Sequence, residues 1–361
     1  MNKEKRDYSL DLLRTIAMFG VVGLHVFGTL EPVLCSDLGK VFLRILYTVL
    51  YCSVNLFALL SGYLYYGRKT KTKSIVSIWM ATLFWGMCIA LLAICLNYST
   101  LKGVLSIFIP FISGRLWYIT DYTFVFFMIP FMNRLIDSLE NKETYRLLIL
   151  LFLMLSVGST FLIRDRLGIV GVGYSAVWLC FNYLIGGAIN KYGFGYLTPQ
   201  KTVLVILINS GIMIMSSYFV DAMGFSENYI LYRYASPFIV INSVLIFNFV
   251  NNCIHITGNK IKRLLSWTSS VSLGVYIIHA NPFFLDNIIT ADNLELLFGS
   301  NNEVCKIGGG IITVCLIFLM CGVLENIRKY IFDLIGIKKM EEEVSGFIDK
   351  MMDFMVRKLL N

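Results

Sequence analysis

The sequence predicts an all-α, polytopic integral membrane protein with about ten transmembrane helices and with both termini in the cytoplasm. Apolar residues make up 57% of the 361 residues and charged residues only 15%, whereas an ordinary globular chain has about 25% charged residues. The mean hydropathy is +0.72. Apolar stretches of about 20 residues, the length that crosses a bilayer, recur along the chain.

Ten such stretches follow one another between the termini. The apolar segment 101–113 is too short to cross a bilayer and is expected to be re-entrant or interfacial. Residues 336–361 space their apolar side chains as an amphipathic helix does, so we expect a cytoplasmic tail after a transmembrane domain over 1–335. The expected spans are 10–30, 42–66, 74–96, 117–135, 146–163, 169–190, 202–220, 229–250, 267–288 and 307–332.

The loops support this topology. If the N-terminus is cytoplasmic, the loops that should be cytoplasmic are rich in Lys and Arg, and the others hold mostly Asp and Glu. The net charge of +8 therefore has its source in cytoplasmic loops and does not indicate a nucleic-acid partner. No C-x-x-C pair occurs, so we expect no metal site; a disulfide between Cys35 and Cys305, both in expected outer loops, stays open.

Two ionisable residues interrupt the first apolar stretch. Arg14 and His25 are eleven residues apart, which returns them to within roughly 20° of one helix face, about 16 Å apart along the axis. A charged group in hydrocarbon costs at least ~2.5–3.5 kcal/mol, so we expect the pair to face a protein interior or a wet cavity. The alternative is a polar pair that only holds helices together.

The chain has three histidines, and two of them fall in expected spans. His25 and His279 lie about 22 and 18 Å from the inner ends of their helices, so the two imidazoles share one layer if these helices are neighbours. Pro282 is expected to kink the helix of His279. An interhelical hydrogen bond is the alternative role for His279. His255 falls in a basic inner loop and is expected to be solvated.

The residue types suggest chemistry on an anionic donor. Arg14, Arg68 and Lys71 are expected to form a cytoplasmic anion site, because a guanidinium group binds phosphate with two hydrogen bonds. A neutral histidine such as His25 can act as a general base near pH 7 and deprotonate a hydroxyl that attacks an activated acyl group. The alternative for the run GRKTKTK, which contains Arg68 and Lys71, is an ordinary cytoplasmic charge cluster.

Four motifs occur in order between about residues 8 and 335. They are the Arg-x10-His of DLLRTIAMFGVVGLH, the Ser-Gly of NLFALLSGYLYYGR, the Leu-Trp-aromatic segment of GRLWYITDYTFVFFMIP, and the late Tyr-x-x-His of SLGVYIIHANP. Together they resemble the acyltransferase 3 family of bacterial integral-membrane acyltransferases.

The resemblance implies roles for individual residues. It implies a catalytic role for Arg14 and His25, and a donor-binding role for Arg14 and Arg68. Where relatives often carry a second arginine, this chain has Lys71, which keeps the charge but not the two-pronged binding. The resemblance also implies an acceptor path, for which we name Trp117, Tyr118 and His279. For Trp117 and Tyr118 the alternative is an aromatic belt at the membrane surface.

The resemblance finally implies an enzyme of the bacterial cytoplasmic membrane. It would transfer an acyl group, with acetyl expected, from acyl-CoA to a sugar hydroxyl of a surface polysaccharide, a lipid-linked precursor or a glycolipid. Acyl-CoA is then a substrate, membrane lipids are the surroundings, and no cofactor is held permanently. The alternatives are a carrier or flippase without acyl chemistry, and a membrane sensor or scaffold. Transporters usually show internal repeats, and the sequence has none that we recognise.

Overall fold

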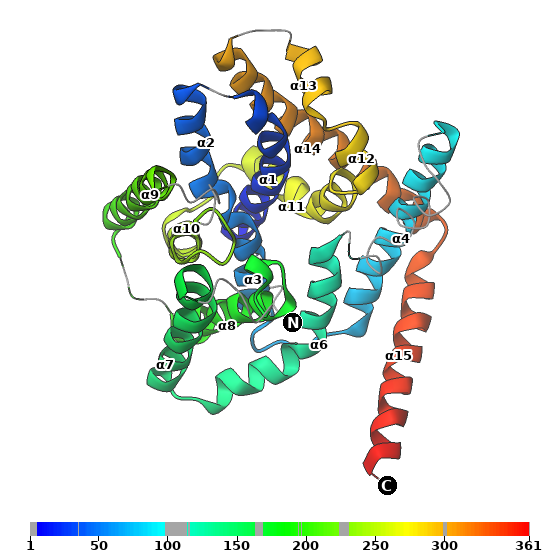
Figure 1. Cartoon of the computed structure of the whole chain (residues 1–361). Helices are drawn as coiled ribbons and strands as arrows, with labels where there is room; N and C mark the ends of the chain where they lie inside the picture. Colours follow the sequence, from blue (N-terminus) through cyan, green and yellow to red (C-terminus); the bar gives the residue numbers. More distant parts are fainter. Residues whose placement is uncertain are drawn as a thin grey trace.

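A computed structural model describes residues 6–34, 36–97, 114, 116–162, 169–193, 195, 197–223, 231–298 and 302–360. Within these residues every regular element is a helix, which confirms the all-α prediction (Figure 1). The main helices are α1 (Tyr8–Leu30), α2 (Asp37–Leu50), α3 (Cys52–Tyr65), α4 (Thr72–Cys95), α6 (Trp117–Ser138), α7 (Asn141–Phe152), α8 (Ala176–Tyr192), α9 (Pro199–Ala222), α10 (Pro237–Cys253), α11 (Asn259–His279), α12 (Pro282–Asn287), α13 (Ala291–Phe298), α14 (Glu303–Leu334) and α15 (Ile337–Leu360).

The chain is a multi-pass membrane protein, but the count of ten spans is not confirmed. In the described residues six helical segments are long and apolar enough to cross a membrane: Tyr8–Val33, Asp37–Tyr65, Thr72–Cys95, Asn141–Phe161, Pro199–Ala222 and Glu303–Leu334. The helix α10 is apolar but has only 17 residues. Three further expected spans overlap α6, α8 and α11, and these helices are not both long enough and apolar enough to be counted with the six. The count of ten and the cytoplasmic termini stay predictions.

The physical reason for the missing spans is visible in α6 and α11. Both helices contribute side chains to the wall of an internal cavity, and those of α11 include several serines. A helix whose polar side chains face protein can lie at membrane depth without the uniform apolar surface that a hydropathy criterion requires.

Two expected spans are interrupted in the structure. The stretch 42–66 falls in the segment Asp37–Tyr65, which has a one-residue break at Tyr51 between the end of α2 at Leu50 and the start of α3 at Cys52. The ninth span was expected to continue through a kink at Pro282. Instead, α11 ends at His279, and Pro282 is the first residue of a separate helix, α12. Proline fits the first turn of a helix because the backbone N–H that it lacks has no helical partner there.

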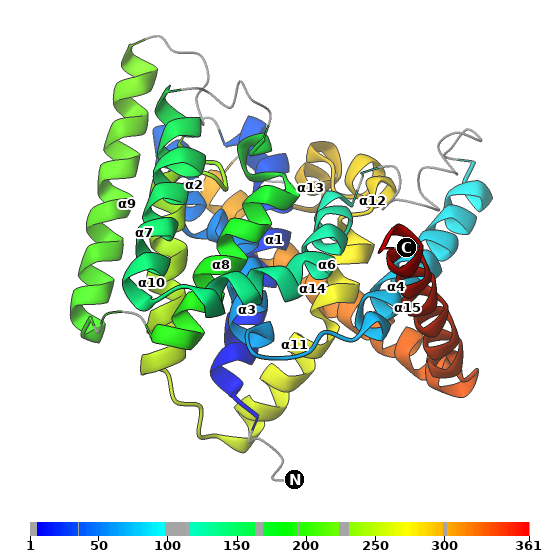
Figure 2. The ribbon, with the colours of Figure 1, turned by 90° about the horizontal axis from the view of Figure 1, so that it is seen from below.

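Helix α1 lies in the middle of the molecule, and Figures 1 and 2 show the other helices around it. It begins where the side chain of Asp7 accepts a hydrogen bond from the backbone N–H of Ser9. It packs against α2, α3, α10, α11 and α14. Its fully buried apolar side chains, which form part of the core, are Leu13, Ala17, Val22 and Val26.

Helices α3 and α8 approach each other very closely through glycines. A Cβ atom on Gly62 would lie 2.0 Å from the carbonyl oxygen of Tyr183, and one on Gly186 would lie 2.1 Å from that of Leu59. No side chain fits at either position, so this crossing requires glycine. The Ser-Gly motif of the sequence therefore has a packing reason, because Gly62 is its glycine.

The expected helix in the tail is present as α15. It packs on α4 and α14, and both views show it on the outer side of the molecule (Figures 1 and 2). Lys73 Nζ binds Glu342 Oε1 at 2.7 Å, and Thr72 Oγ1 donates to Asp349 Oδ1 at 2.6 Å. The hydrogen bond from Lys73 lowers the pKa of Glu342, so this contact is present at neutral pH and is lost as falling pH protonates the carboxylate.

Candidate functional site

A cavity of about 580 Å³ opens between α1, α3, α6 and α11, and we call it the central cavity. Its wall is mostly apolar and aromatic, with a few polar groups, as is typical of sites that bind small molecules. The polar and aromatic residues that line it are Arg14, His25, Phe57, Ser61, Tyr65, Trp117, Tyr118, Tyr122, Tyr174, Tyr234, Ser269, Ser270, Ser272 and Tyr276.

Arg14 and His25 line the same side of the central cavity. Met18 and Val21 lie between them on α1 and also line it, so these four residues form one stripe along the helix. The stripe repeats at intervals of three and four residues, as one helix face requires. The structure thus confirms that the two ionisable residues face one interior space.

The guanidinium group of Arg14 is held at one end of the cavity. Its Nη1 donates to Ser269 Oγ of α11 at 2.8 Å and lies 3.9 Å from Asp11 Oδ1. About a third of the side chain, 34%, remains exposed. Arg14 is therefore anchored to a neighbouring helix and still presents part of its charge to the space around it.

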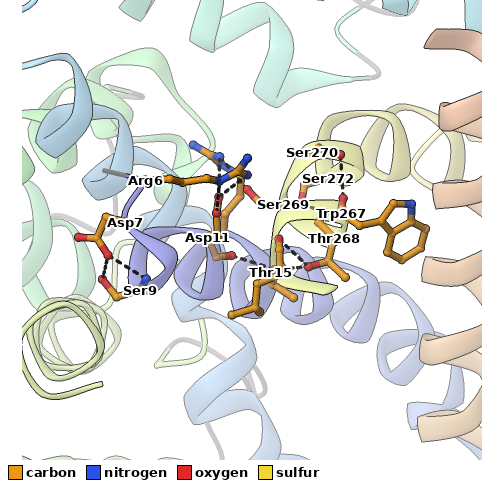
Figure 3. A network of polar contacts seen from close by, with 12 residues as sticks. Arg6, Asp7, Ser9, Asp11, Thr15, Trp267, Thr268, Ser269, Ser270 and Ser272 are labelled. Carbon is orange, nitrogen blue, oxygen red and sulfur yellow. Dashed lines mark hydrogen bonds and ion pairs between the residues drawn. The ribbon is translucent and has the colours of Figure 1, made fainter. Parts of the chain in front are cut away.

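Polar contacts next to Arg14 join α1 to α11 (Figure 3). Arg6 donates to both oxygens of Asp11, at 2.6 and 3.1 Å. The hydroxyls of Thr15 and Thr268 lie 2.7 Å apart. This network was not predicted from the sequence, although the run Thr268–Ser269–Ser270 is unusual for an expected span and indicated a polar helix face.

The imidazoles of His25 and His279 lie next to each other, with ring centroids 5.1 Å apart. This confirms that the two histidines occupy one layer. His279 is 1% exposed and is not among the residues that line the central cavity; it lies behind His25. His279 was expected among the substrate-binding residues, whereas in the structure its ring packs against that of His25.

The hydrogen bonds of the two rings are incomplete. Nδ1 of His279 lies 2.5 Å from the carbonyl oxygen of Val275 in the same helix. A carbonyl only accepts, so this nitrogen carries the proton and Nε2 of the neutral ring carries the lone pair. Neither Nε2 of His279 nor Nδ1 of His25, both buried, has a hydrogen-bond partner in the described part of the chain. His25 itself lines the cavity, and its Nδ1 is buried.

Aromatic side chains form another wall of the central cavity. Trp117 and Tyr118, both named from the sequence, line it together with Tyr174 and Tyr234. The ring of Trp117 lies 4.7 Å from that of Tyr174 and 6.1 Å from that of Tyr234. The tyrosines outside the recognised segment could not be assigned from the sequence, because Tyr174 and Tyr234 lie in turns that are distant along the chain.

The remaining expected donor residues lie elsewhere. Arg68 and Lys71 are exposed in the connection between α3 and α4 and are not among the residues that line the central cavity. Their expected role in binding the donor stays a prediction. His255 is exposed between α10 and α11, as expected. Cys35, and with it the open disulfide to Cys305, lies outside the described residues, as does segment 101–113.

Comparison with known protein families gives a match over most of the chain. The model of the acyltransferase 3 family, described as an acyltransferase domain, matches residues 7–323. That range holds Arg14, His25, Trp117, Tyr118 and His279. No curated protein and no solved structure matches the chain.

Proposed function

We propose a function from one established premise: the chain belongs to the acyltransferase 3 family and is a membrane acyltransferase. In our proposal it takes an acyl group, with acetyl expected, from acyl-CoA and passes it to a sugar hydroxyl. The acceptor belongs to a surface polysaccharide, a lipid-linked precursor or a glycolipid, and the enzyme works in a bacterial cytoplasmic membrane. The supporting observation is that one cavity brings together Arg14, His25 and an aromatic wall.

His25 is the general base of the proposed reaction. Its Nε2 takes the proton of the sugar hydroxyl while the hydroxyl oxygen attacks the carbonyl carbon of the thioester. The C–S bond then breaks, and the CoA sulfur leaves with the proton that the imidazolium returns. The products are the sugar ester and CoA, with His25 neutral again.

His279 holds His25 in the orientation that this step needs. Two imidazoles joined by an N–H···N bond of about 2.9 Å have centroids about 5 Å apart, and the observed separation is 5.1 Å. A small rotation of the His25 ring lets its Nδ1–H donate to Nε2 of His279, which gives both unpartnered nitrogens a partner. His25 is then fixed as the tautomer whose Nε2 can accept a proton.

Arg14 orients the donor. Its guanidinium group suits the phosphates of CoA, and the axial distance of about 16 Å from Arg14 to His25 can be crossed by the slim pantetheine arm. The acceptor lies against Trp117 and the tyrosines, since flat rings offer apolar surface to the C–H faces of a sugar and tyrosine hydroxyls can bind its hydroxyl groups.

The Arg14→Lys variant tests the donor role. It keeps the charge but loses the planar group that binds phosphate through two bonds and that reaches Ser269. We expect the KM for acyl-CoA to rise about tenfold or more, with a smaller effect on the acceptor KM. Steady-state kinetics of the purified protein with each substrate varied in turn measures this. A variant that uses acyl-CoA like the parent and loses only acceptor affinity would place the donor elsewhere.

Sidedness tests the complete proposal. CoA phosphates are too costly to move through a bilayer, so acyl-CoA should work only from the membrane face that carries Arg68, and the acceptor mainly from the side of Trp117. The measurement uses sealed vesicles of known orientation with each substrate supplied on one side. Product formed at full rate with both substrates on the Arg68 side contradicts a transmembrane route. Absence of any thioester cleavage in solubilised protein favours the carrier.

A further inference from the structure

A groove of about 480 Å³ lies where α1 and α11 begin, and we call it the basic groove. Its lining includes Arg6 and Tyr8 from the start of α1 and Lys262, Arg263 and Ser270 from α11. It is separate from the central cavity, and neither the sequence motifs nor the proposed reaction uses its cations.

The basic groove adjoins the Arg14 end of the central cavity. Ser270 lines both spaces, and the residue before it, Ser269, accepts the hydrogen bond of Arg14. Lys329 of α14 adds another cation here, because its Nζ donates to the carbonyl oxygen of Ser270 at 2.6 Å and to its hydroxyl at 3.3 Å. The basic groove and the central cavity therefore share Ser270 as a wall residue, next to the contact between Ser269 and Arg14.

The charge balance of the groove is strongly positive. The carboxylate of Asp11 is bound to Arg6 and lies near Arg14. Lys262 and Arg263 form no salt bridge within the described residues; Lys262 Nζ instead lies 5.6 Å from the ring centre of Tyr8, and Arg6 Cζ lies 6.0 Å from it. Several cations around one aromatic ring suit a ligand that combines phosphate groups with a flat ring.

We propose that the basic groove binds the nucleotide end of the acyl donor. The phosphates lie on Lys262, Arg263 and Arg6, the base lies against Tyr8, and the pantetheine arm passes Ser270 and Arg14 into the central cavity. This inference rests on the proposed function. It assigns the phosphates to the beginnings of α1 and α11, at the mouth of the cavity. The exposed Arg68 and Lys71 then contribute little to binding of the donor phosphates.

A comparison of two donors tests the inference. Acyl-pantetheine carries the same thioester as acyl-CoA but lacks the nucleotide, so the ratio of their kcat/KM values measures what the nucleotide contributes. We expect the double variant Lys262→Ala/Arg263→Ala to lower kcat/KM for acyl-CoA about 10- to 100-fold and to leave acyl-pantetheine turnover unchanged. Lys260→Ala is the matched control, because Lys260 lies in the same turn of α11 and is not in the groove lining.

Several results would overturn the inference. One is an equal loss with both donors, which makes the two cations structural. Another is loss of the acyl-CoA preference in Arg68→Ala/Lys71→Ala but not in the groove variant, which puts the nucleotide at the α3–α4 connection. A third is that the loss of kcat/KM in the groove variant occurs in phosphatidylglycerol vesicles but not in phosphatidylcholine vesicles. This result would identify the phosphate ligand as a lipid headgroup.

Binding of CoA itself separates this inference from the proposed function. Isothermal titration of the full-length, solubilised parent and of the groove variant needs no turnover. If the parent transfers no acyl group but binds CoA through Lys262 and Arg263, the reaction is wrong and the groove assignment stands. If the parent turns over acyl-CoA and the groove variant binds CoA equally well, the groove assignment is wrong and the reaction stands.

Discussion

The His25→Ala variant loses acyl transfer by about 10²–10⁴-fold, the range that removal of a general base produces. We expect His25→Gln to fail as well, because glutamine can form hydrogen bonds in the cavity but cannot take up the proton of the acceptor hydroxyl. The measurement is the rate of acyl transfer from acyl-CoA by purified protein at saturating substrate.

The chain offers a matched control for this experiment. His255 is exposed on a loop, and His255→Gln should retain parental activity. Thermal unfolding of each variant separates a catalytic loss from a folding defect. Near-parental transfer by His25→Gln, with normal stability, would mean that His25 only contributes to packing or hydrogen bonding.

The His279→Leu variant gives the second large effect. Leucine fills the space but offers no acceptor to Nδ1–H of His25, so the base loses its fixed orientation and tautomer. We expect kcat to fall by about 10²-fold, with the KM for acyl-CoA nearly unchanged, because the donor contacts lie elsewhere. His279→Gln should recover part of the loss, since its side-chain oxygen can accept a hydrogen bond near the position of the missing Nε2.

The small number of histidines allows a direct observation of this pair. A protein labelled with ¹⁵N in histidine has three imidazoles, and the His255→Gln spectrum assigns the exposed one. In the parent, His25 should be a single tautomer protonated at Nδ1; in His279→Leu it should become a mixture. A His25 signal that does not change, together with equal activities of the Leu and Gln variants, would leave His279 a packing role only.

The sequence predicted the helical fold because apolar composition is a strong signal over 20 residues. It was least informative where a helix is interior. Serines of α11 and tyrosines of α6 line the central cavity, so a hydropathy count that assumes lipid on all sides cannot decide whether these helices span the membrane. The break at Tyr51 falls inside a continuous apolar stretch, so hydropathy alone could not predict it.

The site was predictable where it lies on one helix. The spacing of Arg14 and His25 along α1 determines that they share a face, whatever the rest of the fold. The basic groove and the aromatic wall could not be predicted in this way. The groove combines Arg6 with Lys262, and the wall combines Tyr174 with Tyr234, and only the tertiary structure brings these residues together.

The glycine crossing of α3 and α8 has a consequence for how such an enzyme can diversify. Ser61 and Tyr65 line the cavity within a few residues of Gly62, where the two backbones leave no space for a side chain. Substitutions that shift this wall would separate the helices. Tyr174 and Tyr234 lie instead in turns outside α8 and α10, with rings 4.9 Å apart. The backbone is close here too, because a Cβ on Gly173 would lie 2.5 Å from Cβ of Tyr234. If the acceptor binds as proposed, its preference would therefore change more readily by exchange of these two ring side chains than by insertions in either segment.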